Sequence, residues 1–218
     1  MAAAYVREQL PGVFVTAATD LSRELREYER TSTAVVNAYV GKMVQGYIER
    51  RLEGGLKAQG FRDRFFVMES SGGVMTVASA ALRPALLMES GPVAGVIGSA
   101  HLGVRMGRPD VISFDMGGTT AKCCLVEDGR PAVTDLYFVG GYDRGFPVQA
   151  PMLDVVEVGA GGGSIAWLDE TGSLRIGPKS AGSEPGPVAY GKGGSEPTVT
   201  TPTSCSAGSI RTTSSAAR

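Results

Sequence analysis

The 218-residue sequence is poor in the side chains that build soft-metal centres and disulfide frameworks. It contains three cysteines and a single histidine, His101. Cys123 and Cys124 are adjacent, so the sequence has neither a C-x-x-C pair nor an even-numbered disulfide pattern. Because neighbours on a strand point to opposite faces, we interpret these two as small core side chains in a reducing cytoplasm. We assign no metal to His101.

The sequence also lacks an excess of either charge and any long apolar run. Lysine and arginine total 21, aspartate and glutamate total 22, and the formal net charge is −1. Nucleic acid and anionic membranes select basic surfaces, so neither is an expected partner. No apolar run approaches the roughly 18 residues of a membrane-spanning helix, and no signal peptide is recognised. With 43% apolar and 20% charged residues, the composition is typical of a globular cytoplasmic protein.

The clearest helical pattern lies in the first quarter of the chain. Hydroxyl residues at 31–33 are expected to cap it, and apolar residues recur every three or four positions as far as Arg51. We interpret this stripe as core packing; it consists of Val36, Tyr39, Val40, Met43, Tyr47, Ile48 and Leu52. Thr76 is expected to cap a second, short helix, residues 85–88 to form a strand, and Glu89 to open another helix.

Residues 111–126, VISFDMGGTTAKCCLV, predict a strand, a polar turn and a second strand. Glycines in the turn can adopt positive φ and aim backbone N–H groups at an anion, while hydroxyls and a nearby cation add to its attraction. The candidate anion-binding residues are Gly117, Gly118, Thr119, Thr120 and Lys122. The alternative is a plain hairpin whose glycines only form the turn.

Three carboxylates near this stretch are candidates for metal binding or acid–base chemistry. Asp115 ends what we expect to be a buried strand, and it suits a magnesium ion or its waters, or the orientation of an attacking group. Asp154 and Glu157 lie three residues apart downstream. They are expected near one site, although on an extended segment they would point to opposite faces.

Residues 159–164 (GAGGGS) form a second glycine-rich stretch. Such a segment can wrap an anion with its backbone N–H groups. The candidates are Gly161, Gly162, Gly163 and Ser164. A flexible loop is the alternative, because no strong helical pattern follows to complete a dinucleotide-binding motif.

FDMGGTTAK resembles the phosphate-binding hairpin of the actin, Hsp70 and sugar-kinase superfamily. With ESGPVAGVIGSAHLG (89–103) upstream and the block at 156–200 downstream, the chain is similar to the hydantoinase A and oxoprolinase family, which includes the ATP-binding subunit of acetone carboxylase. The resemblance implies an α/β, ribonuclease H-like ATPase fold with two lobes, and ATP and Mg²⁺ as cofactors.

The resemblance also implies an activity. ATP would phosphorylate the carbonyl oxygen of a cyclic amide such as a hydantoin or 5-oxoproline, and a hydantoinase B-type partner subunit would complete ring opening. A ketone is the substrate in the acetone carboxylase branch. The turn glycines and threonines would hold phosphates, Asp115 the magnesium shell, Lys122 would offset charge, and Glu157 joins Asp115 as a catalytic candidate.

The family pattern divides the chain into three parts. Residues 1–108 correspond to the end of the first lobe and 109–200 to the start of the second, so the fold is expected to be incomplete at both ends. Residues 201–218 are small and hydroxylated. If GC-rich codons are assumed and the frame is moved by one nucleotide, 201–217 can encode DADLVLGRIDPDDFLGG, which matches the family. We therefore interpret this tail as a disordered frameshift product. A truncated, non-catalytic protein without ATPase activity is the alternative to an enzyme.

Overall fold

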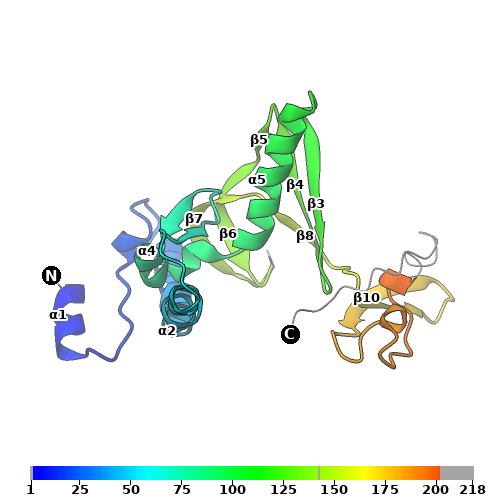
Figure 1. Ribbon diagram of the computed structural model, residues 1–218, viewed down its shortest axis with the longest axis horizontal. Helices are drawn as coiled ribbons and strands as arrows, with labels where there is room; N and C mark the ends of the chain where they lie inside the picture. The colour runs from blue at the N-terminus through cyan, green and yellow to red at the C-terminus, as the bar shows by residue number, and fades with distance from the viewer. Residues whose placement is uncertain (1, 142, 202–218) are drawn as a thin grey trace. The chain divides into compact units, whose positions relative to one another are not determined.

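A computed structural model describes residues 2–141 and 143–201 (Figure 1). Except for Thr201, the predicted frameshifted tail (201–218) lies outside the described residues. The chain forms two compact units. The first contains residues up to 111 together with 124–155, and the second contains 112–123 and the chain from 156 onward. The predicted lobe boundary near residue 108 stays a prediction.

The fold is mixed α/β, as the sequence predicts. The helices are α1 (Ala2–Gln9), η1 (Ala18–Asp20), α2 (Glu27–Gly46), η2 (Tyr47–Glu53), α3 (Gly54–Ala58), α4 (Val77–Leu82), η3 (Pro84–Leu87), α5 (Ser90–Arg105) and η4 (Val188–Tyr190). The strands are β1 (Phe66–Met68), β2 (Val74–Thr76), β3 (Val111–Met116), β4 (Ala121–Glu127), β5 (Arg130–Pro131), β6 (Val133–Val139), β7 (Phe146–Leu153), β8 (Val156–Val158), β9 (Ser164–Leu168) and β10 (Leu174–Ser180).

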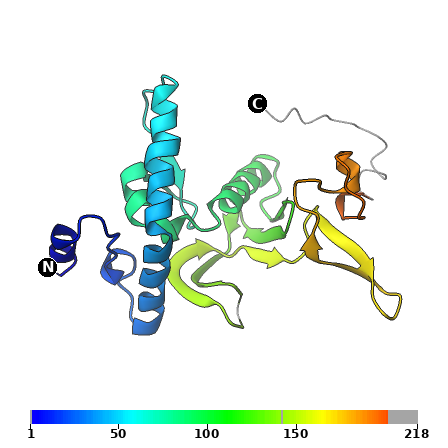
Figure 2. The same ribbon diagram turned by 90° about the horizontal axis from the view of Figure 1, so that it is seen from below.

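Helix α2 is the longest element of the first unit, and it packs on the antiparallel hairpin of β6 and β7 (Figure 2). The helix begins at Glu27, so the hydroxyl residues expected to cap it lie inside its second turn. Its predicted apolar stripe is confirmed as core only in part: Ile48, just beyond the helix, is buried and Val36 packs against a core cluster, whereas Tyr39 is 88% and Met43 72% exposed. The buried side chains of α2 are instead polar or small, namely Thr33, Asn37 and Gly41.

Hydrogen bonds hold this polar face of α2 in place. Thr33 Oγ1 accepts from Gln149 N of β7 (2.8 Å) and donates to Glu29 O (2.6 Å). Asn37 Oδ1 accepts from Ala85 N (3.0 Å). Since Thr33 and Asn37 are fully buried, each bond replaces one that water supplies in the unfolded chain.

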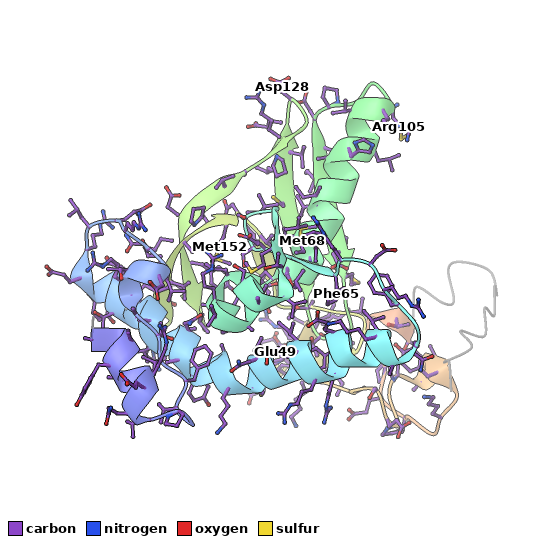
Figure 3. All side chains as sticks on the ribbon, turned by 60° about the vertical axis from the view of Figure 1, so that its left-hand side comes forward. Glu49, Phe65, Met68, Arg105, Asp128 and Met152 are labelled. Atoms are coloured by element: carbon purple, nitrogen blue, oxygen red, sulfur yellow. The ribbon has the colours of Figure 1, made fainter. Side chains whose placement is uncertain are left out.

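The described residues of the first unit form three apolar clusters. One joins Val93 and Val96 of α5 to Cys124 and Val126 at the end of β4. A second surrounds Ile48, and a third surrounds Met152, whose side chain Figure 3 shows in the interior of the unit. Helix α5 starts after Glu89, where the sequence predicts a helix start.

The residues between α4 and α5 form a helical turn and not the expected strand. Thr76 caps α4 as predicted, its side chain accepting from Ser79 N. Residues 84–87 then form η3, because Pro84 occupies the first helical position and Ala85 N bonds to Asn37. Ser70 Oγ fastens this turn by contacting the carbonyls of Leu86 and Met88.

In the second unit, β4 pairs with β3 on one side and antiparallel to β8 on the other. The unit also contains the antiparallel hairpin of β9 and β10 and a bridge between Ile165 and Thr198. Across the described parts of the chain, no helix combines the length and apolar content needed to cross a membrane.

Candidate functional site

The predicted hairpin forms, and its polar turn (117–120) packs against the glycine loop (159–164). The four carbonyl oxygens of the turn all accept hydrogen bonds, three of them from the glycine loop. From donor to acceptor these bonds are Gly117 N to Thr120 O (3.0 Å), Gly162 N to Gly117 O (2.9 Å), Gly163 N to Gly118 O (2.6 Å) and Ser164 Oγ to Thr119 O (3.4 Å).

Unlike the carbonyl groups, most backbone N–H groups of the turn have no partner among the described residues. The backbone N–H groups of Gly118, Thr119 and Thr120 make no hydrogen bond to any residue that the structure describes. With the carbonyls occupied, the remaining donors form a patch of positive partial charge. The turn can therefore attract an anion, and its positive partial charge disfavours a cation at the same position.

Glycine is needed in the loop and not, as expected, for positive φ in the turn. Gly117 and Gly118 are not among the glycines with positive φ. A Cβ on Gly161 would instead overlap the backbone of Thr119 and Thr120, and one on Gly162 would lie 2.7 Å from Thr200 Oγ1. The loop can thus approach the turn closely only because it carries no side chains.

The N–H and hydroxyl groups predicted to bind a nucleotide from the glycine loop are largely engaged in this packing. Ser164 is 2% exposed, and its Oγ accepts from Gly161 N (3.0 Å) while contacting Thr119 O. The N–H groups of Gly162 and Gly163 bond to the turn. The loop therefore orients the turn, and a direct contact between the loop and a ligand stays a prediction.

A cavity of about 330 Å³ opens beside the turn. Its size lies at the lower end of the range for small-molecule sites. It is lined by Met116, Gly117, Gly118, Gly162, Tyr190, Val199 and Thr200. All of these residues belong to the second unit.

Four of the lining residues were not among the sequence candidates, and two of these, Tyr190 and Thr200, carry polar side chains. Thr200 donates from both N (2.9 Å) and Oγ1 (2.7 Å) to Gly162 O, and these two hydrogen bonds hold the glycine loop in place. Tyr190 is half-exposed in η4. Neither lies in a motif whose chemistry can be recognised from residue types alone, because the segments that bring them to the cavity are irregular.

Asp115 lies at the end of β3, just before the turn. The strand is not buried as expected: Ile112 is 68% and Phe114 58% exposed, and Asp115 is exposed as well. Because neighbours on a strand point to opposite faces, Asp115 shares its face with the buried Ser113 and not with Ile112 and Phe114. Asp115 is an exposed carboxylate two residues before Gly117 of the turn.

Glu157 and Lys122 face each other across β8 and β4. They occupy paired positions in the ladder, and Lys122 Nζ lies 3.8 Å from Glu157 Oε2. The lysine side chain is 18% exposed and the glutamate 51%. The cation predicted to offset phosphate charge is thus already matched by one carboxylate.

Asp154 belongs to the first unit, in which its backbone N donates to Ala132 O (2.9 Å). Its charge, together with the dominant effect of burial, raises the pKa of the Cys124 thiol. Cys124 is 2% exposed and Cys123 partly exposed, in agreement with opposite-facing neighbours on a strand. Within the described residues, no three His, Cys, Asp or Glu side chains gather into a metal-binding group.

The chain resembles a set of related proteins over most of its length. The sequence profile of the Hydantoinase/oxoprolinase family matches residues 30–206. An uncharacterised protein of Methanocaldococcus jannaschii is 45% identical over 203 residues, covering 89% of this chain and 30% of that protein. Caprolactamase subunit alpha of Pseudomonas jessenii is 40% identical over 199 residues, covering 91% and 28%.

Two solved structures share the fold. The crystal structure of ATP-dependent caprolactamase from Pseudomonas jessenii matches with a TM-score of 0.69 at 39% identity, covering 91% of this chain and 28% of that one. A nucleotide-free structure of acetone carboxylase matches with a TM-score of 0.68 at 27% identity, covering 89% and 27%. The chain spans less than a third of the length of these relatives, and it belongs to the Hydantoinase/oxoprolinase family.

Proposed function

We propose that this chain carries a nucleotide-phosphate site of an ATP-dependent enzyme, with the turn 117–120 as its anion-binding element. The observation that carries the proposal is the polarity of the turn: its carbonyls are all bonded to protein, while the N–H groups of Gly118, Thr119 and Thr120 have no acceptor in the described chain. Converging backbone donors are the usual cradle for phosphate. Such a hairpin also agrees with the proposed two-lobed actin-like fold.

The residues near the turn suit a magnesium ion. Mg²⁺ bound with a nucleotide usually takes one or two carboxylates, several waters and phosphate oxygens. Asp115 offers an exposed carboxylate at the adjoining strand end. We therefore assign Asp115 to the ion or its waters, where the metal would neutralise charge that develops on the phosphates.

The other site candidates have supporting roles in this proposal. Glu157 restrains Lys122, so the lysine reaches a phosphate only by sharing its charge with that carboxylate. Gly161 and Ser164 hold the turn in shape. Asp154, in the other unit, is kept as a metal candidate without a described partner ligand.

The proposed reaction is ATP-dependent activation of a carbonyl group. Phosphorylation of the carbonyl oxygen makes the carbonyl carbon more electrophilic, so that water adds to it and the ring C–N bond breaks with the nitrogen taking a proton. A second water then releases phosphate from the acyl phosphate that remains. The caprolactamase relative favours a cyclic amide, whereas the acetone carboxylase match keeps a ketone as the second candidate. The caprolactamase relative is named as a subunit, which supports a partner subunit for this chain. A hydantoinase B-type partner and a cytoplasmic location are part of the proposal.

We propose that the 218-residue chain, tested by itself, binds Mg·ATP without turning it over. In a two-lobed ATPase the reacting phosphate is enclosed by both lobes, and this chain spans less than a third of its relatives. The alternative of a non-catalytic protein therefore concerns the turnover of ATP, and the binding of Mg·ATP is the property that tests the site.

The experiment compares two glycine-to-alanine variants in equilibrium binding of Mg·ATP. Gly161→Ala forces a Cβ into the turn backbone, whereas a Cβ on Gly159 meets nothing within 4 Å. We expect Gly159→Ala to bind as the unchanged chain does. Gly161→Ala should lose about 1–3 kcal/mol of stability from overpacking and bind at least tenfold more weakly.

Circular dichroism confirms that each variant is folded before binding is measured. The proposal is rejected if the unchanged chain shows no saturable binding of Mg·ATP, or if a folded Gly161→Ala binds as tightly as Gly159→Ala. Asp115→Asn provides a second check, because it should weaken ATP binding in the presence of Mg²⁺ more than in its absence.

A further inference from the structure

A cavity in the first unit has a cationic lining that the proposed nucleotide site does not use. It measures about 770 Å³ and lies among the segment before α2, helix α1 and the end of α4. Its charged lining residues are Arg7, Arg23, Arg83 and Asp20. Three arginines thus face one carboxylate, in a chain whose formal net charge is −1.

The arginines differ in how much of their hydrogen-bonding capacity is occupied. Arg7 donates to Val15 O (3.1 Å) and lies 3.8 Å from Asp20, so it is only partly neutralised. Arg83 donates to Ser79 Oγ. Arg23 is exposed and makes no side-chain hydrogen bond or ion pair with the described residues. Most of the guanidinium donors therefore remain available to a ligand.

The walls of this cavity are fixed to each other by a buried side chain. Asn37 Nδ2 donates to Thr16 Oγ1 (2.9 Å) on one wall and to Leu82 O (3.2 Å) on the other. Asn37 is fully buried in α2. The cavity is thus held open by the core of the unit, and its shape does not depend on exposed side chains alone.

We propose that this cavity is a second anion site, which binds a compact organic dianion between Arg7, Arg23 and Arg83. The planar fork of arginine pairs with two oxygens of a carboxylate or phosphate, and the cavity volume lies in the range of small-molecule sites. The hydroxyls of Thr16, Thr19 and Ser79 line the same space and add polar contacts. This site would recognise the carboxylate or phosphate groups of a metabolite, independently of nucleotide binding at the turn.

Isothermal titration calorimetry of the 218-residue chain tests the proposal, with succinate and inorganic phosphate as separate probes and neutral succinamide as the control ligand. We expect saturable binding of at least one dianion and none of succinamide. Which probe binds distinguishes a dicarboxylate ligand from a phosphate ligand. Absence of binding by both dianions overturns the proposal.

A matched pair of charge-removing variants locates the binding. Arg23→Gln should weaken dianion binding at least tenfold, since one charge-assisted pair is lost. Arg105→Gln removes the same charge from the end of α5 (Figure 3), where the side chain is exposed, and should change the Kd by less than twofold. Equal weakening by both variants would show non-specific attraction and overturn the proposal.

The turn variants separate this site from the nucleotide site. Folded Gly161→Ala should retain dianion binding, and Arg23→Gln should retain Mg·ATP binding. If Gly161→Ala loses the dianion while Arg23→Gln keeps it, the dianion binds at the turn, and the second site is rejected while the nucleotide site stands.

Discussion

Asp169 shows how a single carboxylate organises a turn in the second unit. It follows β9, and its oxygens accept from Thr171 N (3.0 Å), Ser173 N (2.9 Å) and Arg175 Nε (2.8 Å). The Thr171 hydroxyl also donates to it (2.6 Å). The Thr171 hydrogen bond is the largest of the effects that lower the pKa of Asp169 from 3.8 to about 2.

This shift predicts the sign of a pH effect on the β9–β10 hairpin. Because the pKa is lower in the folded state, ionised Asp169 stabilises the hairpin above pH 3.8, and the contribution is lost as the pH falls towards 2. Asp169→Asn should therefore lower the urea midpoint most near neutral pH and least near pH 2.

Trp167 provides the measurement for this prediction. It is the only tryptophan of the chain, it pairs with Arg175 in the hairpin, and its indole N–H donates to Gly177 O (2.7 Å). Its fluorescence during urea unfolding reports this hairpin. A difference between the two proteins that grows on acidification would contradict the assignment.

At the scale of elements, hydrogen bonds from the buried polar face of α2 add to the packing of those residues of the predicted apolar stripe that reach the core, which include Val36 and Ile48. Thr33→Val keeps the shape of the side chain but leaves the N–H of Gln149 without its acceptor in a buried position. We expect the free energy of unfolding to fall by about 1–3 kcal/mol. Urea denaturation followed by circular dichroism measures the change.

Thr33→Ser is the matched control, because it keeps the hydroxyl and removes one methyl group, worth about 0.8 kcal/mol. If the serine variant is less stable than the valine variant, packing and not hydrogen bonding fixes α2 on β7.

The hairpin at 111–126 could be predicted because its apolar runs and polar turn are local. Thr76 and Glu89 were recognised as helix starts for the same reason. The polar burial of Thr33 and Asn37 could not be predicted, since their partners lie 116 residues away in β7 and 48 residues away in η3. A periodic pattern of apolar residues predicts that a helix forms, but it does not show which face of the helix packs against another element.

The candidate site was predictable to the same extent. Residue types marked both the turn and the glycine loop as anion-binding segments. Only the structure shows that the N–H groups of Gly162 and Gly163 are bonded to the turn, and that those of Gly118 and Thr119 make no such bond. Backbone donors look alike in a sequence, and long-range packing decides which of them meet an acceptor.

At the scale of the molecule, the chain divides into two compact units that share the strands β3 and β4. The GGTT turn and the glycine loop lie in the second unit, while the arginine-lined cavity lies in the first. Large apolar side chains such as Phe114 and Tyr39 are exposed. The chain spans less than a third of the length of the relatives that it matches.

The central claim is that the backbone donors of the turn bind nucleotide phosphate, and the most direct measurement is an NMR titration of the ¹⁵N-labelled chain with Mg·ATP. We expect saturable chemical-shift changes that are largest at the amides of Gly118, Thr119 and Thr120. The changes should be smaller at the amides of Gly162 and Gly163, which are hydrogen-bonded to the turn, and absent with adenosine. Unchanged amide signals at 118–120 under saturating Mg·ATP, or equal shifts with adenosine, would contradict it.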